Sequence, residues 1–221
     1  VFKKLDKDKN TKVIILEGSG NGFSAGHNLK EVRGHKNRSN HQRLFNLCSK
    51  LMLQIVEGNK PVIAKVHGAA YAAGCQLVAS CDLAYSSNSA VFATPGVNIG
   101  LFCSTPMVAV SRKGNRKHMM KMLLTGEPIK ANFAKDIGLI NDYFPKNKLN
   151  KEVLKLANVI ASKSNLTIKI GKKAFYKQLE MPLKKAYQFT SKMMTLNMMA
   201  QDAKEGISAF LEKRKPNWKN K

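Results

Sequence analysis

The stretch Pro61-Val62-Ile63-Ala64-Lys65-Val66 leads into Gly68-Ala69-Ala70-Tyr71-Ala72-Ala73-Gly74-Cys75, and this passage decides the fold. The first part is rich in β-branched residues and predicts a buried strand. The second part is a turn made of small residues, and a helical pattern restarts from Gln76 to Ser80. A strand that passes through a tight turn into a helix predicts one unit of a parallel α/β fold.

Similar elements flank this unit in the sequence. Before it, Val13-Ile14-Ile15-Leu16 predicts a strand that runs into the turn Gly18-Ser19-Gly20-Asn21-Gly22. Between them, apolar residues at helical spacing predict an amphipathic helix that ends near Gly58: Leu44, Cys48, Leu51 and Ile55. After it, short strands are expected at 83–85 and 91–93. The repetition of strand, helix and strand predicts a parallel sheet with right-handed connections.

From about Thr105 onward the pattern becomes helical. Spaced apolar residues predict helices over 119–124, 131–137, 149–162, 166–179 and 183–213. We therefore expect an α/β core at 1–140 and a C-terminal helical region at 141–221. The methionine clusters at 119–122, 193–194 and 198–199 are interpreted as packing in the core or between subunits rather than as a ligand site.

Composition excludes several classes of protein. The chain has 221 residues, 43% hydrophobic and 24% charged, which is ordinary for a globular protein and excludes disorder. Its apolar runs are too short to span a membrane. The four cysteines lack C-x-x-C and zinc-ligand spacing, so we expect free thiols, a reducing compartment and no metal site.

Charge is the unusual property of the sequence. Thirty-eight Lys and Arg stand against fourteen Asp and Glu, which gives a net charge of +24. Such an excess favours anionic partners, namely nucleic acid, acidic membrane or phosphorylated small molecules. The alternative is compositional drift, since the lysines are scattered over nearly every predicted surface.

Both strand-to-helix turns are built from Gly, Ala and Ser and should present backbone N–H groups near a helix N-terminus. Such groups bind anions or a developing oxyanion. A nucleotide-binding loop is the alternative for 18–22, but neither the P-loop pattern nor G-x-G-x-x-G is met.

A series of ordered motifs follows these turns. Residues 23–30, Phe23-Ser24-Ala25-Gly26-His27-Asn28-Leu29-Lys30, resemble F-x-A-G-x-D-L-K, and 61–68 with 73–77 resemble P-x-I-A-x-V-x-G and G-G-x-E-L. Further matches lie at 81–84, 92–95, 124–129, 134–140 and 205–216. In this order, the motifs resemble the crotonase superfamily, the enoyl-CoA hydratase/isomerase proteins. The resemblance implies an α/β, ClpP-like spiral of ββα units with a helical C-terminal trimerisation region, assembled as a trimer or a dimer of trimers.

The resemblance also implies an acyl-CoA ligand and its contacts. The thioester oxygen would be held by the backbone amides of His27 and Ala73, which form an oxyanion hole. Coenzyme A comes with the substrate, so no separate cofactor is expected. Phe210 and Lys213 match positions on the C-terminal helix that approach the coenzyme A of a neighbouring subunit. The other residues matched to the ligand site are Ser24, Ala25, Gly26, Leu29, Lys30 and Gly74.

The pattern breaks at the acid and base of hydration. Hydratases use two carboxylates, and these positions are Gln76 and Gly96 here, neither of which exchanges a proton at neutral pH. The resemblance therefore supports the fold and the oxyanion hole more strongly than hydration. An isomerase or thioesterase with a substitute group is an alternative. His27, Asn98 and Cys103 are the candidates for that group, but His27 could act only through its backbone and Cys103 could be a packed thiol.

Nonenzymatic roles are also open. The chain could bind an acyl-CoA without turnover, or bind RNA through Lys169, Lys172, Lys173 and Lys177, which share one face of a predicted helix. A solvated basic face is the simpler interpretation of these lysines. The resemblance implies fatty-acid metabolism by lyase or isomerase chemistry, in mitochondria or, alternatively, in the cytoplasm. The family's first β-hairpin, with part of its adenine-binding surface, is expected before Val1.

Overall fold

A computed structural model describes residues 1–34 and 37–221 of the protein. These residues divide into two compact units. The sheet unit comprises Ile15–Val56 and Val62–Lys155, and the helical unit comprises Val1–Ile14, Glu57–Pro61 and Leu156–Lys221. This division differs from the predicted boundary between residues 140 and 141, because the strand Asp142–Phe144 pairs within the sheet.

A four-stranded sheet forms the centre of the sheet unit. Its order is β1 (Ile14–Glu17), β2 (Val62–Val66), β4 (Leu83–Ser87) and β7 (Asp142–Phe144). Strand β4 pairs in parallel with β2 on one side and with β7 on the other, which confirms the predicted parallel arrangement. Strand β2 is buried at four of its five positions, as its continuous apolar sequence predicts.

A second, three-stranded sheet was not expected. Strand β3 (Ala70–Tyr71) pairs in parallel with β5 (Val91–Ala93), and β5 pairs antiparallel with β6 (Ile129–Lys130). The prediction of an uninterrupted small-residue turn at 68–75 is therefore wrong. Its backbone forms β3, and helix α4 (Ala73–Ser80) begins three residues earlier than the predicted Gln76.

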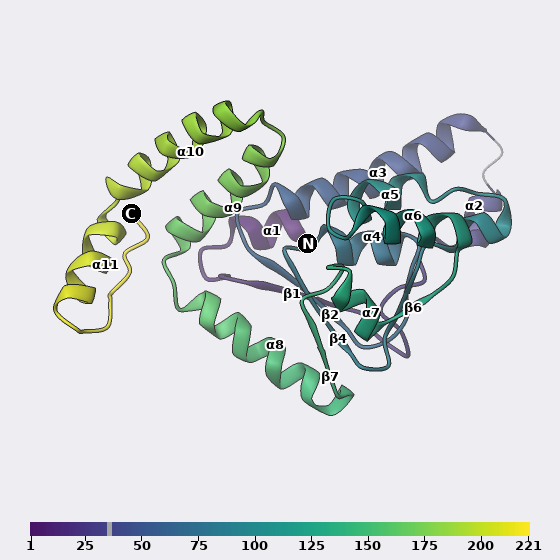
Figure 1. Cartoon of the computed structure of the whole chain (residues 1–221), viewed down its shortest axis with the longest axis horizontal. Coiled ribbons are helices and arrows are strands. Elements are labelled where there is room, and N and C mark those ends of the chain that lie inside the picture. Colours follow the sequence, from purple (N-terminus) through teal and green to yellow (C-terminus); the bar gives the residue numbers. More distant parts are fainter. Residues whose placement is uncertain (35–36) are drawn as a thin grey trace. The chain divides into compact units, whose positions relative to one another are not determined.

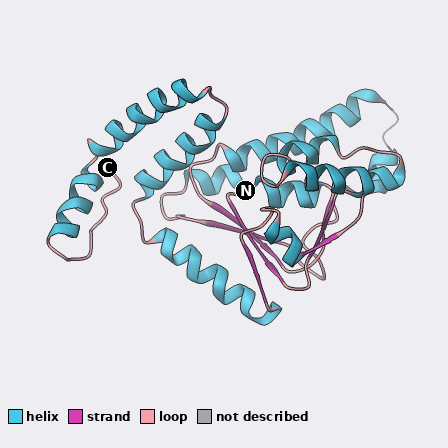
Figure 2. Ribbon diagram, viewed as in Figure 1, coloured by secondary structure: helices cyan, strands magenta, loops and turns pink. Residues whose placement is uncertain are grey.

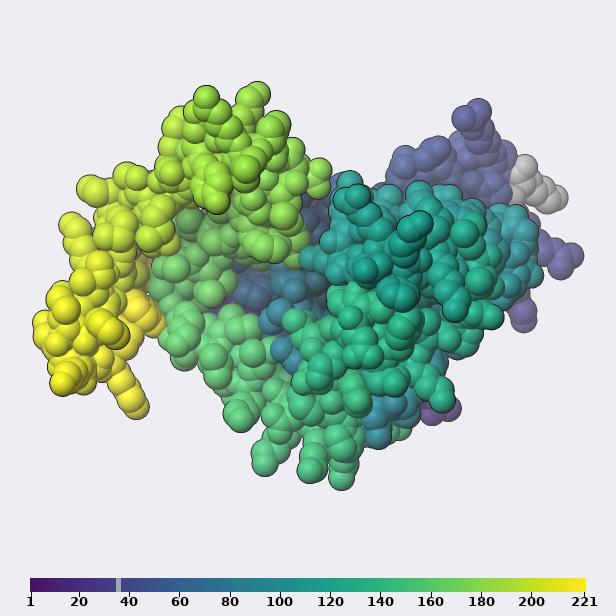
Figure 3. Space-filling view, in the orientation of Figure 1, coloured from purple at the N-terminus to yellow at the C-terminus, as the bar shows by residue number. Residues whose placement is uncertain are grey.

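Helices cover one side of the strands in the sheet unit (Figures 1 and 2). Helix α4 packs on α3 (Arg38–Val56) and on α5 (Ser104–Val110). The teal segment that contains α5 and α6 forms much of the visible surface of this unit in Figure 3. The remaining elements of the unit are α2 (Leu29–Gly34), the 3-10 helix η1 (Pro95–Ile99), α6 (Arg116–Thr125) and α7 (Ala131–Asp136).

The core of the sheet unit is apolar and fully buried. Ile55, Ile63, Phe92 and Met119 have no exposed surface. Met119 therefore confirms the interpretation of the first methionine cluster as core packing, although its neighbour Met120 is exposed.

The helical unit holds α1 (Phe2–Lys7), α9 (Asn165–Leu179), α10 (Leu183–Met198) and α11 (Gln201–Leu211), and α8 (Lys146–Ala161) enters it at Leu156. The single helix predicted over 183–213 is wrong. The chain leaves helical geometry at Ala200, whose φ of −68° and ψ of 148° are those of extended backbone, so α10 and α11 are separate helices.

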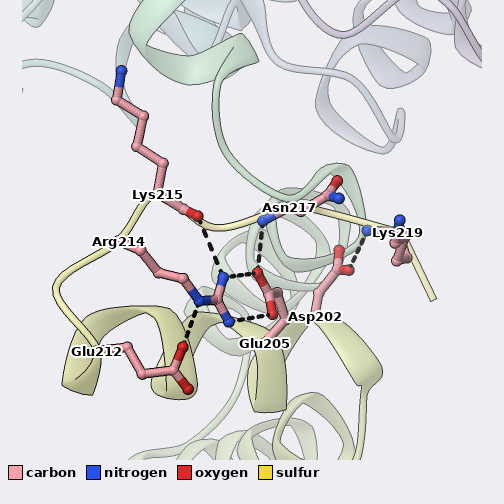
Figure 4. A network of polar contacts seen from close by, with 7 residues as sticks. All are labelled: Asp202, Glu205, Glu212, Arg214, Lys215, Asn217 and Lys219. Atoms are coloured by element: carbon pink, nitrogen blue, oxygen red, sulfur yellow. Dashed lines mark hydrogen bonds and ion pairs between the residues drawn. The ribbon is translucent and has the colours of Figure 1, made fainter.

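A polar clasp closes the C-terminal segment over α11 (Figure 4). Asp202 is 1% exposed and accepts hydrogen bonds from the backbone N–H groups of Lys219 and Asn220 at 2.7 and 3.0 Å. The same carboxylate accepts from Ser164 Oγ at 2.5 Å. Arg214 donates from Nη1 and Nη2 to the two carboxylate oxygens of Glu205 at 2.6 and 3.0 Å. Because the partners come from distant parts of the sequence, the clasp fixes the segment after α11.

Within the described residues, no helix is long and apolar enough to cross a membrane. The same part of the chain holds no group of His, Cys, Asp or Glu that could bind a metal ion. All four cysteines are free thiols.

Candidate functional site

The two small-residue turns of the sheet unit lie against each other. Ser24 N–H donates to the carbonyl oxygen of Ala69 at 3.0 Å, and Tyr71 N–H donates to the carbonyl oxygen of Ser24 at 2.8 Å. These bonds form a parallel bridge between Ser24 and Ala70. The chain around residues 24–27 is thereby held beside the start of α4.

Small residues are required where the turns meet. Gly26 has a φ of +94°, and a Cβ added there would lie 3.2 Å from the backbone nitrogen of Ala73. A Cβ at Gly74 would overlap the carbonyl oxygen of Ser24. Ala72 has a φ of 51° and a ψ of −116°, an arrangement that L residues rarely adopt and that costs about 1–3 kcal/mol. Ala72 directly precedes Ala73, so its strained backbone conformation sets the direction of the first N–H group of α4.

Two backbone N–H groups are left free at this junction. Among the described residues, nothing accepts a hydrogen bond from the N–H of His27 or of Ala73. Ala73 is the first residue of α4, whose N-terminal amides have no partner within the helix and carry the positive end of its dipole. Two free amides of this kind can donate to a negatively charged or polarised oxygen, and the oxyanion role that the resemblance implies for these two residues stays a prediction.

The His27 imidazole packs rather than pairs with a charge. Its ring meets Phe45 edge to face, with centroids 5.7 Å apart and an interplanar angle of 87°. Its role as acid or base therefore stays a prediction, beside the role of its backbone amide.

Gln76 lies one helical turn from Ala73, on α4. It is 3% exposed, and its Oε1 accepts a hydrogen bond from the Cys48 thiol at 3.7 Å. Cys48 comes from α3 and is half-buried, and burial raises the pKa of its thiol. At neutral pH this pair is an amide and a thiol, and it offers no carboxylate to activate water.

Gly96 lies in η1, where the structure leaves no room for a side chain. A Cβ added there would lie 2.5 Å from the carbonyl oxygen of Leu101 and 2.9 Å from Cys103 Sγ. The loop is fixed in this position because Leu101 N–H donates to the carbonyl oxygen of Gly96 at 2.9 Å. The thiol of Cys103 therefore occupies the space where a side chain at position 96 would begin.

The thiols of Cys75 and Cys103 are protonated at neutral pH. Burial raises the pKa of Cys103. Burial and the neighbouring Cys103 raise the pKa of Cys75 to about 12. A nucleophilic cysteine requires the opposite shift, so the environment of Cys103 disfavours that role.

A cavity of about 470 Å³ opens beside this site, along α3. His27 lines it, and so does Cys48, the residue whose thiol donates to Gln76. The rest of its lining is mostly apolar: Leu44, Leu47, Lys50, Leu51 and Gln54. Cys48 was missed as a site residue because its place in an apolar helical stripe predicts only packing.

The other predicted ligand residues are dispersed. Ser24 Oγ accepts from Gly26 N–H at 3.3 Å, which orders the turn, while Ala25, Leu29 and Lys30 are exposed beside it. Asn98 is exposed, and its side chain lies against Gly126. Phe210 is 82% exposed and, like Lys213, belongs to the helical unit.

Two of the four α9 lysines considered for RNA binding are engaged within the helical unit. Lys172 Nζ donates to the carbonyl oxygen of Lys60 at 2.8 Å. Lys177 Nζ lies 5.1 Å from the centroid of the Phe189 ring. Because both lysines make contacts within the protein, fewer charges on this face of α9 are available to RNA than the sequence indicates.

The whole chain, residues 1–221, matches the sequence profile of the family described as enoyl-CoA hydratase/isomerase. The chain belongs to this family. The predicted crotonase fold is confirmed by likeness to solved hydratases.

Individual relatives agree with this assignment to the enoyl-CoA hydratase/isomerase family. The chain is 50% identical over 214 residues to human "Enoyl-CoA hydratase domain-containing protein 3, mitochondrial", with 96% of this chain and 71% of the relative covered. A solved structure of that human domain-containing protein 3 is 47% identical, with a TM-score of 0.94 over 98% of this chain and 88% of the other. From the segments 72–82 and 93–106 we predict a resemblance to this domain-containing protein 3 subgroup, and the identity over 96% of the chain confirms it. A solved enoyl-CoA hydratase from Mycobacterium smegmatis is 45% identical, with a TM-score of 0.96 over 98% of this chain and 84% of that one.

Proposed function

We propose that this protein binds an acyl-CoA thioester and polarises its carbonyl group, without hydrating 2-enoyl-CoA efficiently. The observation that carries the proposal is the pair of free amides, His27 N–H and Ala73 N–H, at the junction of two turns. Donors fixed before the ligand arrives need no reorganisation, and one such donor contributes about 2.7–4 kcal/mol where charge develops on the oxygen.

The apolar cavity along α3 is suited to the acyl chain. Leu44, Leu47 and Leu51 line it together with His27, whose backbone amide is one of the two proposed oxyanion donors. Ser24, Ala25, Leu29 and Lys30 follow the same turn and are the proposed contacts to coenzyme A. A net charge of +24 favours a ligand that carries several phosphates.

Hydration requires a group that takes a proton from water and one that protonates the α-carbon. The amide of Gln76 cannot titrate, and Gly96 has no side chain. We therefore place the protein among acyl-CoA binding members of the family, with isomerisation or thioester hydrolysis as the enzymatic alternative. Asn98 and Cys103, together with His27, are the proposed substitutes for such chemistry.

The cellular setting is proposed from the relatives. The human and Xenopus laevis relatives carry the word mitochondrial in their names, and we propose the same compartment here. We further propose a role in fatty-acid metabolism and a homotrimer or a dimer of trimers. In such an assembly Phe210 and Lys213 would contact the coenzyme A bound by a neighbouring subunit.

The test is binding of a matched pair of ligands by calorimetry. Butyryl-CoA is compared with its S-butyl thioether, which lacks the carbonyl oxygen and is otherwise similar. We expect the thioester to bind at least about tenfold more tightly, because both amides lose their acceptor in the thioether. Equal affinities would exclude the oxyanion site, and failure of both to bind would exclude an acyl-CoA ligand. Hydration of crotonyl-CoA is measured beside a known hydratase and is expected to stay near the uncatalysed rate.

A further inference from the structure

Asn21 is the one asparagine in the sequence that is followed by glycine, and the pair lies in the turn between β1 and the bridge at Ser24. Its side chain is exposed, and its amide forms no hydrogen bond with a described residue. The N–H group of Gly22 also has no acceptor among the described residues. A side-chain amide and the next main-chain nitrogen are therefore both free at this point of the chain.

The main chain of this turn is held in place, in contrast to the two free groups. His67 Nε2 donates a hydrogen bond to the carbonyl oxygen of Gly20 at 3.0 Å. The carbonyl oxygen of Asn21 lies so close to Gly68 that a Cβ added there would be 2.6 Å from it. The turn thus keeps its backbone course, while the exposed side chain of Asn21 is free to rotate toward the nitrogen of Gly22.

Gly22 favours a reaction between these two groups. A side chain on the residue after an asparagine obstructs attack by its nitrogen, and glycine has none. The fold does not require glycine here: its φ is not positive, and an added Cβ would lie 3.4 Å from the carbonyl oxygen of Ala69, an ordinary contact. Gly18 differs, because a Cβ there would lie 2.4 Å from the carbonyl oxygen of Phe23. Alanine therefore fits at position 22 and not at position 18.

We propose that Asn21 is a site of spontaneous deamidation, a reaction that makes asparagine thermolabile in proteins. The nitrogen of Gly22 attacks Cγ of Asn21 and forms a bond with it. The bond from Cγ to Nδ2 breaks, and Nδ2 leaves as ammonia with the proton of the Gly22 N–H group. Water then opens the resulting succinimide and returns a proton to the nitrogen of Gly22. Addition of water at Cγ gives aspartate, and addition at the main-chain carbonyl carbon gives isoaspartate.

Both products change the turn. Each replaces a neutral amide with a carboxylate and lowers the net charge by one. Isoaspartate also adds a methylene group to the main chain, at a point where the backbone packs closely against Gly68. Ser24 pairs with Ala70 shortly afterwards, so we expect the longer chain to disturb this bridge and to lower the unfolding temperature.

The test is incubation of the purified full chain at pH 7.4 and at pH 9, followed by digestion and peptide mass spectrometry. We expect the peptide with Asn21 to be replaced over time by two peptides of equal mass, the aspartyl and isoaspartyl forms, which chromatography separates. The rate should rise with pH, because hydroxide removes the proton of the attacking nitrogen. Asn98 is the internal control: it is exposed but followed by Ile99, so it should keep its amide.

The decisive variant is Gly22→Ala, which keeps Asn21 and obstructs only the attack. It is expected to slow the formation of both products about tenfold or more, which corresponds to a barrier higher by about 1.4 kcal/mol. Gly171→Ala, the same substitution on α9, is the matched control and should leave the rate unchanged. The unfolding temperature should fall during incubation of the unsubstituted protein and stay constant in Gly22→Ala.

Three results would count against the inference. Loss of the Asn21 amide no faster than that of Asn98 would overturn it, and this comparison needs no variant to fold. An equal rate in Gly22→Ala would show that the nitrogen of Gly22 is not the nucleophile. An unchanged unfolding temperature of the deamidated protein would overturn the disturbance of the bridge. All three are measured without a ligand, so they do not depend on the proposed binding of acyl-CoA.

Discussion

The sulfur of Cys103 lies where the side chain of residue 96 would begin, 2.9 Å from the position of a Cβ added to Gly96. The second obstacle there is backbone, the Leu101 carbonyl oxygen at 2.5 Å. A carboxylate at this position would need a different course of the chain between Gly96 and Cys103. The packing of this loop therefore requires glycine at position 96.

Gly96→Ala is expected to destabilise the protein by about 1–3 kcal/mol, because the added methyl group forces the loop to move. Adding Cys103→Ala should recover only part of the loss, since the Leu101 carbonyl remains. Urea unfolding checks both variants. Gly171→Ala is the control: position 171 lies inside α9 with nothing within 4 Å of an added Cβ, and it should gain about 0.5–1 kcal/mol.

Ala72→Gly is expected to stabilise the protein by about 1 kcal/mol, because glycine adopts the positive φ of this position without a steric penalty. Thermal unfolding of the two proteins is compared. Ala70→Gly, a buried alanine in β3 without positive φ, should lose stability instead. A loss of stability in Ala72→Gly would show that the turn is not strained.

Thr94→Val tests a buried hydroxyl. Thr94 is fully buried, and its Oγ1 has no hydrogen-bond partner among the described residues. An isosteric apolar replacement is expected to be neutral or to gain up to about 1 kcal/mol. Ser80→Ala removes a hydroxyl that does donate, to the Gln76 carbonyl at 2.8 Å, and should lose about 0.5–1.5 kcal/mol. A clear loss in Thr94→Val would mean that its hydroxyl has a partner, such as bound water.

Helices and strands could be predicted from the sequence where the spacing of apolar residues within one segment determines them. Helix α3 and strand β2 were predicted because their apolar residues repeat at the period of a helix or fill a buried strand. Strand β3 was missed because two residues, Ala70 and Tyr71, are too few to show a period, and only their pairing with β5 makes them a strand.

The site was predictable in its backbone and not in its side chains. The small-residue turns predicted backbone donors in general, because a close approach of backbone requires small residues, and the resemblance to the enoyl-CoA hydratase/isomerase family implied His27 and Ala73 as those donors. The contact between Cys48 and Gln76 joins α3 to α4, and the contact of Cys103 with position 96 depends on the path of a loop. Neither pairing leaves a pattern in the linear sequence.

The hydrogen bonds to Glu205 in the clasp predict how the stability of the protein depends on pH. Arg214 is the largest cause that lowers the pKa of Glu205 from 4.5 to about 2, and the N–H of Asn217 adds to it. The carboxylate therefore contributes stability that is fully present above the unfolded pKa of about 4.5. That stability is lost as the pH falls from there through about 2.

Unfolding of Glu205→Gln and of the unmodified protein is compared between pH 7 and pH 2. The variant should be less stable at pH 7, and the difference should shrink as the pH falls toward 2. Glu127→Gln, an exposed residue of the sheet unit, should show little difference at any pH. A difference for Glu205→Gln that is constant with pH would contradict the ion pair.

Alkylation of the thiols is expected to follow their burial. Cys48 is half-buried, whereas Cys75 is fully buried with a pKa raised to about 12. Iodoacetamide at pH 7 should therefore modify Cys48 first and leave Cys75 unmodified in the folded protein, as peptide mass spectrometry can measure. Rapid modification of Cys103 at this pH would contradict its raised pKa and would support Cys103 as a nucleophile.

The clasp on Asp202 also bears on synthesis of the chain. Asp202 takes its partners from residue 164 on one side and from residues 219 and 220 on the other. Until the latter have emerged from the ribosome, the carboxylate lacks most of the hydrogen bonds that offset its burial. The helical unit is thus expected to mature only after translation has passed residue 220, whereas the sheet unit, whose residues end at Lys155, can begin to fold while the rest is still being made.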